Sequence, residues 1–195
     1  MKTYDVEAVN HLIRHRRSVF PKDYVPGSKV PDTVITQMLE NANWAPNHGK
    51  TEPWRFFVFS GEGLKTLANT QAELYKQHTT NFDENKYKKL QTNPLLASHV
   101  IAIVMKRQES GKIPEIEEVE AVACAVQNMY LTATAYGVGA YWASGGVTYL
   151  PEAKEVFGLD EADKLLGFFY VGVPAAPPAD GRRSPIAEKV TFIDK

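Results

Sequence analysis

Two basic clusters at opposite ends of this 195-residue chain could bind one phosphate between them. Arg16, Arg17 and Ser18 follow a short helical pattern, and Arg182 and Arg183 follow a proline-rich stretch. A guanidinium group is a planar fork of donors that fits phosphate, and a serine hydroxyl adds another donor. If both clusters reach one ligand, the two ends of the chain lie together over a nucleotide-like cofactor. The alternative is that each cluster is an ordinary solvated segment, because arginine also suits the C-terminal end of a helix.

Two further groups of residues could surround a flat ring. Trp44 and His48 lie in and beside a loop that is predicted from residues 45–53. The indole could lie against an aromatic ring, and the imidazole could donate to the polar edge of that ring. Residues 142–145 end a short strand with small side chains, which let backbone N–H groups approach a ligand closely. Taken singly, Trp44 could be a core residue, His48 a surface residue and residues 142–145 an ordinary turn.

The motifs assign no catalytic side chain and no metal ligand. The five histidines are scattered, and no pair has ligand spacing with a carboxylate. The sequence also lacks a nucleophile elbow, a Walker loop and a glycine-rich dinucleotide fingerprint after a strand. Composition alone leaves a Ser/His/Asp or Cys/His hydrolase open, but no motif supports one.

The composition is that of one globular domain over residues 1–195. Hydrophobic residues make up 44%, charged residues 23%, and the net charge is −1, so no general nucleic-acid or anionic-membrane surface is indicated. No apolar run approaches the ~20 residues that span a bilayer, and residues 1–18 are mixed and polar, so we expect a cytoplasmic protein. The single cysteine, Cys124, lies in an apolar run and is expected to be a small buried side chain.

Helical and strand patterns mix along the chain and predict an α+β sandwich of one sheet with helices around it. Segment 82–90 is charged and expected at the surface, and 174–185 is expected to be extended. Helices are expected near 5–15, 32–42, 61–77, 115–136 and just after 151, and strands at 54–59, 99–104, 140–142, 165–171 and 190–193.

The helix expected at 115–136 is apolar on nearly all sides, which predicts burial all round. It could lie in a subunit interface, with the extended tail wrapping a partner, or it could be the centre of a monomer core.

The joint order of these motifs is more specific than any one of them. Arg-Arg-Ser after the first helix is followed by Ala-Pro-Asn-His at 45–48, Glu-Pro-Trp-Arg-Phe-Phe-Val at 52–58, Trp-x-Ser-Gly at 142–145, Gly-x-Pro at 172–174 and Arg-x-Pro at 183–185. This order resembles the FMN-dependent nitroreductase family, and most closely its small bacterial branch of NAD(P)H nitroreductases. The resemblance covers residues 6–193.

The resemblance implies an intertwined homodimer with a central, mostly antiparallel sheet flanked by helices and with FMN in two interface clefts. Residues 16–18 and Arg183 would bind the phosphate and ribityl chain, and residues 142–145 would approach the isoalloxazine from the other subunit. Segment 132–137 corresponds to one linked to the nicotinamide cofactor. The implied cofactor-binding residues are Arg16, Arg17, Ser18, Trp44, His48, Trp142, Ala143, Ser144, Gly145 and Arg183.

The implied activity is ping-pong electron transfer from NADH or NADPH to nitroaromatics, quinones or other small acceptors. The alternative is an FMN-binding protein with little turnover, for storage or sensing; dehalogenation or flavin fragmentation would need a lid insertion for which this chain leaves little room. Phe20, Trp44 and Glu52 replace residues that relatives use near the ring, two of them cations. We therefore expect only modest nitro reduction.

Overall fold

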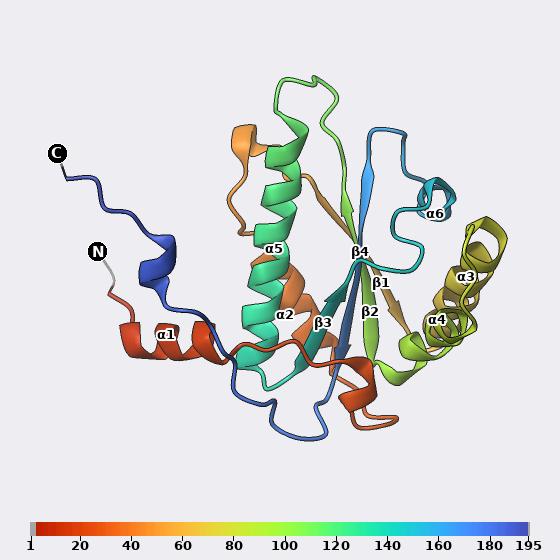
Figure 1. The fold of residues 1–195 in the computed structure, drawn as a ribbon, viewed down its shortest axis with the longest axis horizontal. Coiled ribbons are helices and arrows are strands. Elements are labelled where there is room, and N and C mark those ends of the chain that lie inside the picture. The colour runs from red at the N-terminus through yellow and green to blue at the C-terminus, as the bar shows by residue number, and fades with distance from the viewer. Residues whose placement is uncertain (1–2, 195) are drawn as a thin grey trace.

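The fold is built on a four-stranded antiparallel sheet with strand order β1-β2-β4-β3. The structure is a computed structural model that describes residues 3–194. Figure 1 shows helices on both sides of this sheet, so the predicted α+β class is confirmed. The strands are β1 (Trp54–Ser60), β2 (His99–Met105), β3 (Gly139–Ala143) and β4 (Lys164–Gly172).

Strand β2 lies inside the sheet, between β1 and β4, and all seven of its residues are buried. Its side chains alternate between two cores: Ile101 and Ile103 pack into one, Val100 and Val104 into the other. A strand buried on both faces gives a continuous apolar run, which is the pattern that predicted it. The aromatic and aliphatic run at 54–59 predicts a strand with most positions buried, and this is wrong: only Trp54 is buried, because β1 is an edge strand.

Helices α2 and α5 lie on one face of the sheet, and α3, α4 and α6 lie on the other (Figure 1). Helices α2 and α5 share a core with Met38, Met129 and Phe169, all of which are fully buried. The helices are α2 (Asp32–Ala42) and α5 (Glu115–Ala135) on the first face, and α3 (Glu62–His78), α4 (Glu84–Leu96) and α6 (Pro151–Val156) on the second.

Helix α4 occupies the segment that was expected to be charged surface without a helix. The side chain of Asp83 caps its first turn by accepting from the backbone N–H of Lys86 at 2.9 Å. Only Pro94 among its residues is buried, so the apolar periodicity that normally signals a helix is weak here. Its existence therefore depends on the cap and on packing against α3.

Helix α5 is buried on one side only within this chain. Residues at helical spacing form its outer face, which is exposed or only partly covered: Ile116, Glu120, Cys124, Gln127 and Leu131. The expectation of burial all round is therefore wrong for the single chain. The expected burial of Cys124 is wrong for the same reason, since its thiol lies on this outer face.

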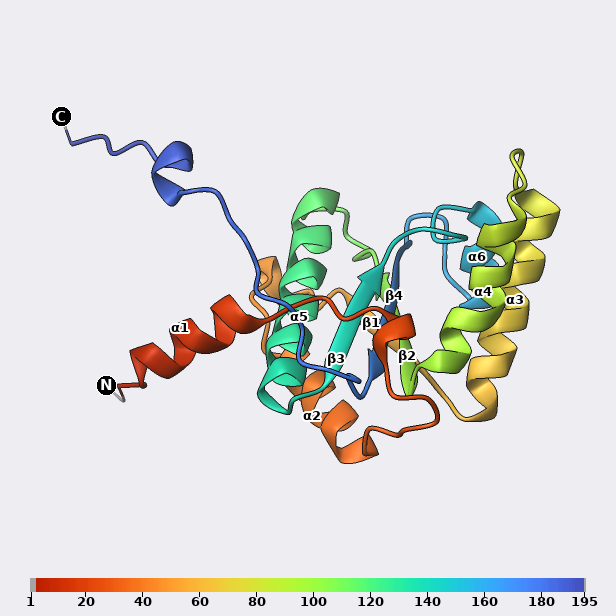
Figure 2. The same ribbon diagram turned by 60° about the horizontal axis from the view of Figure 1, so that its bottom comes forward.

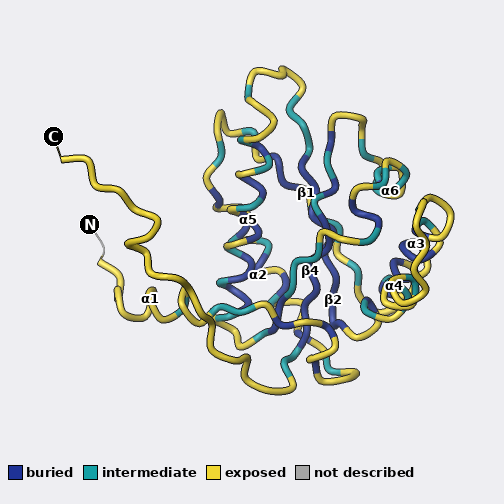
Figure 3. The backbone as a smooth tube through the Cα atoms, in the orientation of Figure 1, coloured by how far each residue is buried: buried dark blue, intermediate teal, exposed yellow. Residues whose placement is uncertain are grey.

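Helix α1 (Val6–His15) and the C-terminal tail project together from the body of the molecule (Figures 1 and 2). None of the residues of α1 is buried, and Figure 3 shows both segments as exposed. The tail bends at residues 175–176, has no helix or turn from there to residue 185, in line with the extended segment predicted, and then forms a short 3₁₀ turn (Ile186–Lys189). The strand predicted at 190–193 is absent, because no strand of the described chain lies beside it; Phe192 and Ile193 are 89% exposed.

Across the described residues, none of the helices combines the length and the apolar character that crossing a bilayer requires.

Candidate functional site

The two predicted basic clusters meet in one cavity. The loop after α1 lies along the edge of β3, where Ser18 bridges Ala140 and Val19 N donates to the Ala140 carbonyl at 2.9 Å. The C-terminal tail crosses this loop, and Arg17 Nε donates to the carbonyl of Ala179 at 3.1 Å. The cavity between them is about 510 Å³ and is lined by Ile13, Arg14, Arg16, Arg17, Gln127, Gly181 and Arg183.

This cavity is strongly positive. Four of its lining residues are arginines, and none of the described residues that line it is acidic. Gly181 lets the tail pass close to Arg17, because a Cβ at this position would lie 2.6 Å from the guanidinium carbon. Arginines gathered without a carboxylate favour a bound anion such as phosphate.

Trp142 lies at the same end of the molecule as this basic cavity. The guanidinium carbon of Arg16 is 4.8 Å from the ring centre of Tyr130, and the Tyr130 hydroxyl accepts from Trp142 N at 2.7 Å. Trp142 Nε1 donates to the carbonyl of Leu166 at 3.0 Å, which fixes the indole on β4. The sequence analysis missed Tyr130, because one hydroxyl in an apolar helix gives no signal of a site.

The turn that follows Trp142 is set by a close approach of two strands. A Cβ at Gly167 would lie 2.3 Å from the carbonyl oxygen of Ala143, and its φ of +119° is open to glycine. Ser144 and Gly145 follow on an exposed turn. Ala143, Ser144 and Gly145 therefore stand free to face a ligand, although they are not in the basic cavity itself.

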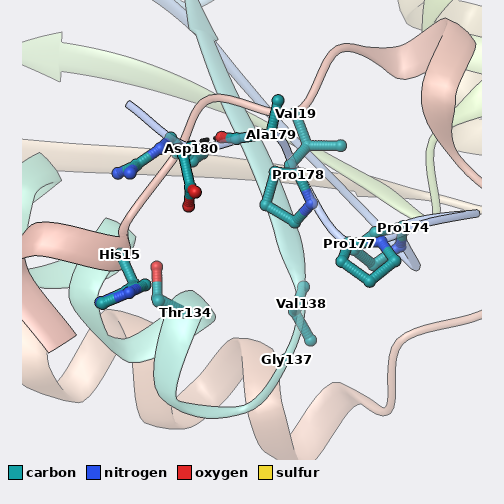
Figure 4. A pocket seen from close by; sticks show the side chains of 11 residues that line it. His15, Val19, Thr134, Gly137, Val138, Pro174, Pro177, Pro178, Ala179 and Asp180 are labelled. Atoms are coloured by element: carbon teal, nitrogen blue, oxygen red, sulfur yellow. Dashed lines mark hydrogen bonds between the residues drawn. The ribbon is translucent and has the colours of Figure 1, made fainter. Parts of the chain in front are cut away.

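A second cavity, of about 270 Å³, lies beneath the tail beside Arg17. Figure 4 shows the tail prolines Pro174 and Pro177 on one side and Thr134 on another. Thr134 and Gly137 belong to the segment whose resemblance implied a nicotinamide contact. The tail thus covers the end of α5 as well as the arginines.

The loop that carries His48 is held in an unusual backbone conformation. Positive φ angles occur at Gly49 (62°), Lys50 (54°) and Glu52 (43°). Asn47 Oδ1 accepts from Glu52 N at 3.1 Å. Such angles are strained for residues other than glycine and occur often at functional sites. The side chain of His48 is exposed, and its Nδ1 is 2.6 Å from Oε2 of Glu117 in the first turn of α5.

Trp44 is 85% exposed, so it is not a core residue in this chain. It lines an open cavity of about 570 Å³ between α1, α2 and α5, together with Asn41, Leu131, Thr132 and others. Leu131 belongs to the outer face of α5, so Trp44 stands beside that face.

The structure brings Arg16, Arg17, Arg183 and Trp142 together but leaves His48 apart. His48 contacts Glu117 near the start of α5, and Arg16 contacts Tyr130 near its end. At 1.5 Å per residue, these two points on α5 are about 20 Å apart. Residues 3–194 also contain no cluster of three histidine, cysteine or acidic side chains that could hold a metal ion.

Comparison with known proteins identifies the family. The model of the Nitroreductase family matches residues 13–173. The Bacillus subtilis protein "Putative NAD(P)H nitroreductase YfhC" is 32% identical over 181 residues, covering 92% of this chain and 91% of that protein. A nitroreductase-like structure from Bacillus cereus has a TM-score of 0.80 at 28% identity, with complete coverage of both chains.

A structure from Desulfovibrio desulfuricans, described as a nitroreductase in complex with FMN, has a TM-score of 0.70 at 24% identity and covers 99% of both chains. At that identity it shows the shared fold. The family match and the full-length relatives confirm the resemblance found in the motifs. This chain belongs to the Nitroreductase family.

Proposed function

We propose that this protein is an FMN-dependent oxidoreductase that takes electrons from NADH or NADPH and delivers them to small oxidised acceptors. The proposal rests on one observation above all: in a chain of the Nitroreductase family, segment 13–17 and segment 181–183 meet at a cavity with four arginines and no described acidic lining residue. FMN is bound in the similar Desulfovibrio structure, and NAD(P)H is named for the Bacillus subtilis relative.

The residues present fit an FMN phosphate. Arg16, Arg17 and Arg183 would hold its oxygens by charge-assisted hydrogen bonds, and Ser18 would add a hydroxyl. The tail crosses these residues because position 181 has no side chain. Bound FMN would accept electrons from the nicotinamide and pass them to the acceptor. The chain itself would orient the donor and acceptor in turn at one place, which is a ping-pong order.

We infer that each site is completed by a second copy of the chain. The outer face of α5 carries Ile116, Cys124 and Leu131 with only two polar side chains between them, and exposed Trp44 stands beside it. Isologous dimers bury such faces against each other. The tail also has exposed Ile186 and Phe192, which suits a segment that wraps a partner. A protomer alone keeps His48 about 20 Å along α5 from Arg16, by the rise of the helix.

We also infer which parts come from which copy. Trp142 shares Tyr130 with Arg16, so residues 142–145 and the arginines would serve the same ligand from one chain. This differs from the expectation that residues 142–145 come from the other subunit. Trp44 and His48 would instead be the partner's contribution, and Glu117 would hold the His48 ring in place.

Nitroaromatics and quinones are the proposed acceptors, with modest nitro reduction. The ring of Phe20 packs on Tyr141 at 4.4 Å between centroids, so this position supplies no positive charge to a ligand. This observation also keeps the second candidate, an FMN-binding protein with little turnover. A single domain over residues 1–195 and a cytoplasmic location stay predictions.

The test is the visible spectrum of the purified protein followed by steady-state oxidation of NADH and NADPH. We expect flavin absorption that NADPH bleaches, and re-oxidation by a quinone or a nitrofuran with parallel-line kinetics. Bleaching without re-oxidation by any acceptor would favour the storage function. A colourless protein that takes up no added FMN would contradict both functions.

A further inference from the structure

A cavity of about 180 Å³ lies on the opposite face of the sheet from α5, between α4 and strands β3 and β4. Lys86, Lys89 and Asn93 line it at spacings of three and four residues, so they share one face of α4. The turn at Gly145 and Gly146 closes one side. Helix α4 lies directly on this turn, because a Cβ at Gly146 would be 2.8 Å from Leu90 Cδ2.

The wall of this cavity contains a buried amide with no partner. Gln71 of α3 is 1% exposed, and neither its Nε2 nor its Oε1 has a hydrogen-bond partner among the described residues. An unsatisfied buried amide costs about 1–3 kcal/mol for each group, so native structures rarely keep one unless a ligand or water completes it. Because Gln71 lines the cavity, water or a ligand held there is a candidate partner for this amide.

The charges around the cavity favour an anion. Lys86 and Lys89 line it, and none of the described lining residues is a carboxylate. Lys88, by contrast, pairs with Glu84 at 3.4 Å and is not in the lining. The Tyr170 hydroxyl is protonated at neutral pH, as in any tyrosine, and burial, with Tyr141 adding to the effect, raises its pKa further. Phe168 and Tyr141 also line the cavity and could flank an aromatic ring.

We propose that this cavity is a subsite for the carboxylate group of an aromatic electron acceptor. This inference rests on the proposed function, because Gly145 belongs both to the cavity and to the turn expected beside the flavin ring. Lys86 and Lys89 would neutralise the carboxylate, and the Gln71 amide would donate to it. The cavity volume of about 180 Å³ is enough for a carboxylate on the edge of one aromatic ring but not for a second ring system. The preferred acceptors are therefore nitro or quinone compounds that carry a carboxylate.

The preference for a carboxylate is tested by measuring turnover with two acceptors that have the same shape but differ in charge. We expect 4-nitrobenzoate to be reduced with a kcat/KM at least ~10-fold above that of the neutral isostere 4-nitrobenzamide, since one charge-assisted bond exceeds 1.4 kcal/mol. Replacing both cavity lysines by methionine (Lys86→Met, Lys89→Met) should abolish this ratio while leaving 4-nitrobenzamide unchanged. The matched control Lys88→Met should keep the ratio. Equal losses for both acceptors would overturn the subsite, because the lysines would then serve the cofactor.

Benzoate binding gives a readout that does not depend on turnover. Titration followed by NMR should shift the Gln71 side-chain amide and should saturate, and both responses should disappear in the double lysine variant. Saturation without turnover of any acceptor would support the anion site while contradicting the proposed function. Normal turnover without benzoate saturation, or a response that Lys88→Met removes equally, would overturn the site.

Discussion

One chain buries the inner face of α5 but leaves the outer face of the same helix largely uncovered. On the inner face, Met129 packs with Met38 and Phe169, and all three are fully buried. The outer face meets solvent, and the segments nearest to it, α1 and the tail after β4, contain no buried residue among those described. Monomeric proteins seldom leave so many apolar side chains uncovered. The difference teaches that folding of one chain finishes the sheet, whereas the candidate site, as we propose it, needs a second copy.

The core under α5 and the exposed C-terminal tail should differ most in how a mutation changes the free energy of unfolding. Phe169→Ala should lower the free energy of unfolding by about 3–5 kcal/mol, because it leaves a cavity in the core. Phe192→Ala removes the same side chain from the tail and should act only through the dimer. Urea unfolding at two protein concentrations checks this. The loss in unfolding free energy caused by Phe169→Ala should be the same at both concentrations, whereas the loss caused by Phe192→Ala should vary with concentration. A concentration-independent loss of equal size for Phe192→Ala would break the comparison.

The basic cavity should govern cofactor content without affecting the fold. Changing Arg17 and Arg183 to alanine removes charge-assisted phosphate bonds worth about 1.5–3 kcal/mol each, so most FMN should be lost on purification. Lys76, exposed on α3 across the sheet, offers a matched control as Lys76→Ala. Flavin absorbance per protein and circular dichroism are the measurements. Unchanged FMN in the double arginine variant would show that the phosphate lies elsewhere.

The unpartnered amide on α3 predicts a gain in stability. Gln71→Leu replaces a buried, unsatisfied group with an apolar one of similar size, and should raise the free energy of unfolding by about 1–2 kcal/mol in the absence of acceptor. Thermal unfolding of both proteins tests this. A lower melting temperature in the variant would indicate that fixed water molecules already satisfy Gln71.

The smallest expected effect is on the pH dependence of stability, through Asp163, which contacts the residues that follow the C-terminal end of β2. Burial works to raise the pKa of Asp163, but hydrogen bonds from Lys106 and from the backbone N–H groups of Arg107 and Asp160 outweigh it and lower the pKa from its ordinary 3.8. A depressed pKa in the folded state contributes stability that is present above pH 3.8 and is lost as the pH falls below it. Asp163→Asn should therefore flatten the acid limb of stability against pH. An acid limb of unchanged slope would contradict this.

Prediction from sequence succeeded where one chain determines the outcome. The strand at β2 and the two arginine clusters were both predicted from local residue types, and the shared cavity agrees with the first of the two interpretations given for the clusters. Helix α4 was missed since charged residues dominate it, and only its cap and tertiary packing reveal it. The expected strand at 190–193 and the burial of Cys124 failed for another reason: both expectations assume neighbours that a single chain does not provide.

Mixed dimers test the central claim, that each site is built from two chains. One parent would carry Arg17→Ala with Arg183→Ala and the other Trp44→Ala with His48→Ala, under different affinity tags, so that only the mixed dimer is isolated. We predict that each parent binds little FMN, whereas the mixed dimer holds about half of the wild-type amount, because one of its two sites is intact. A mixed dimer with no more FMN than its parents would contradict the account.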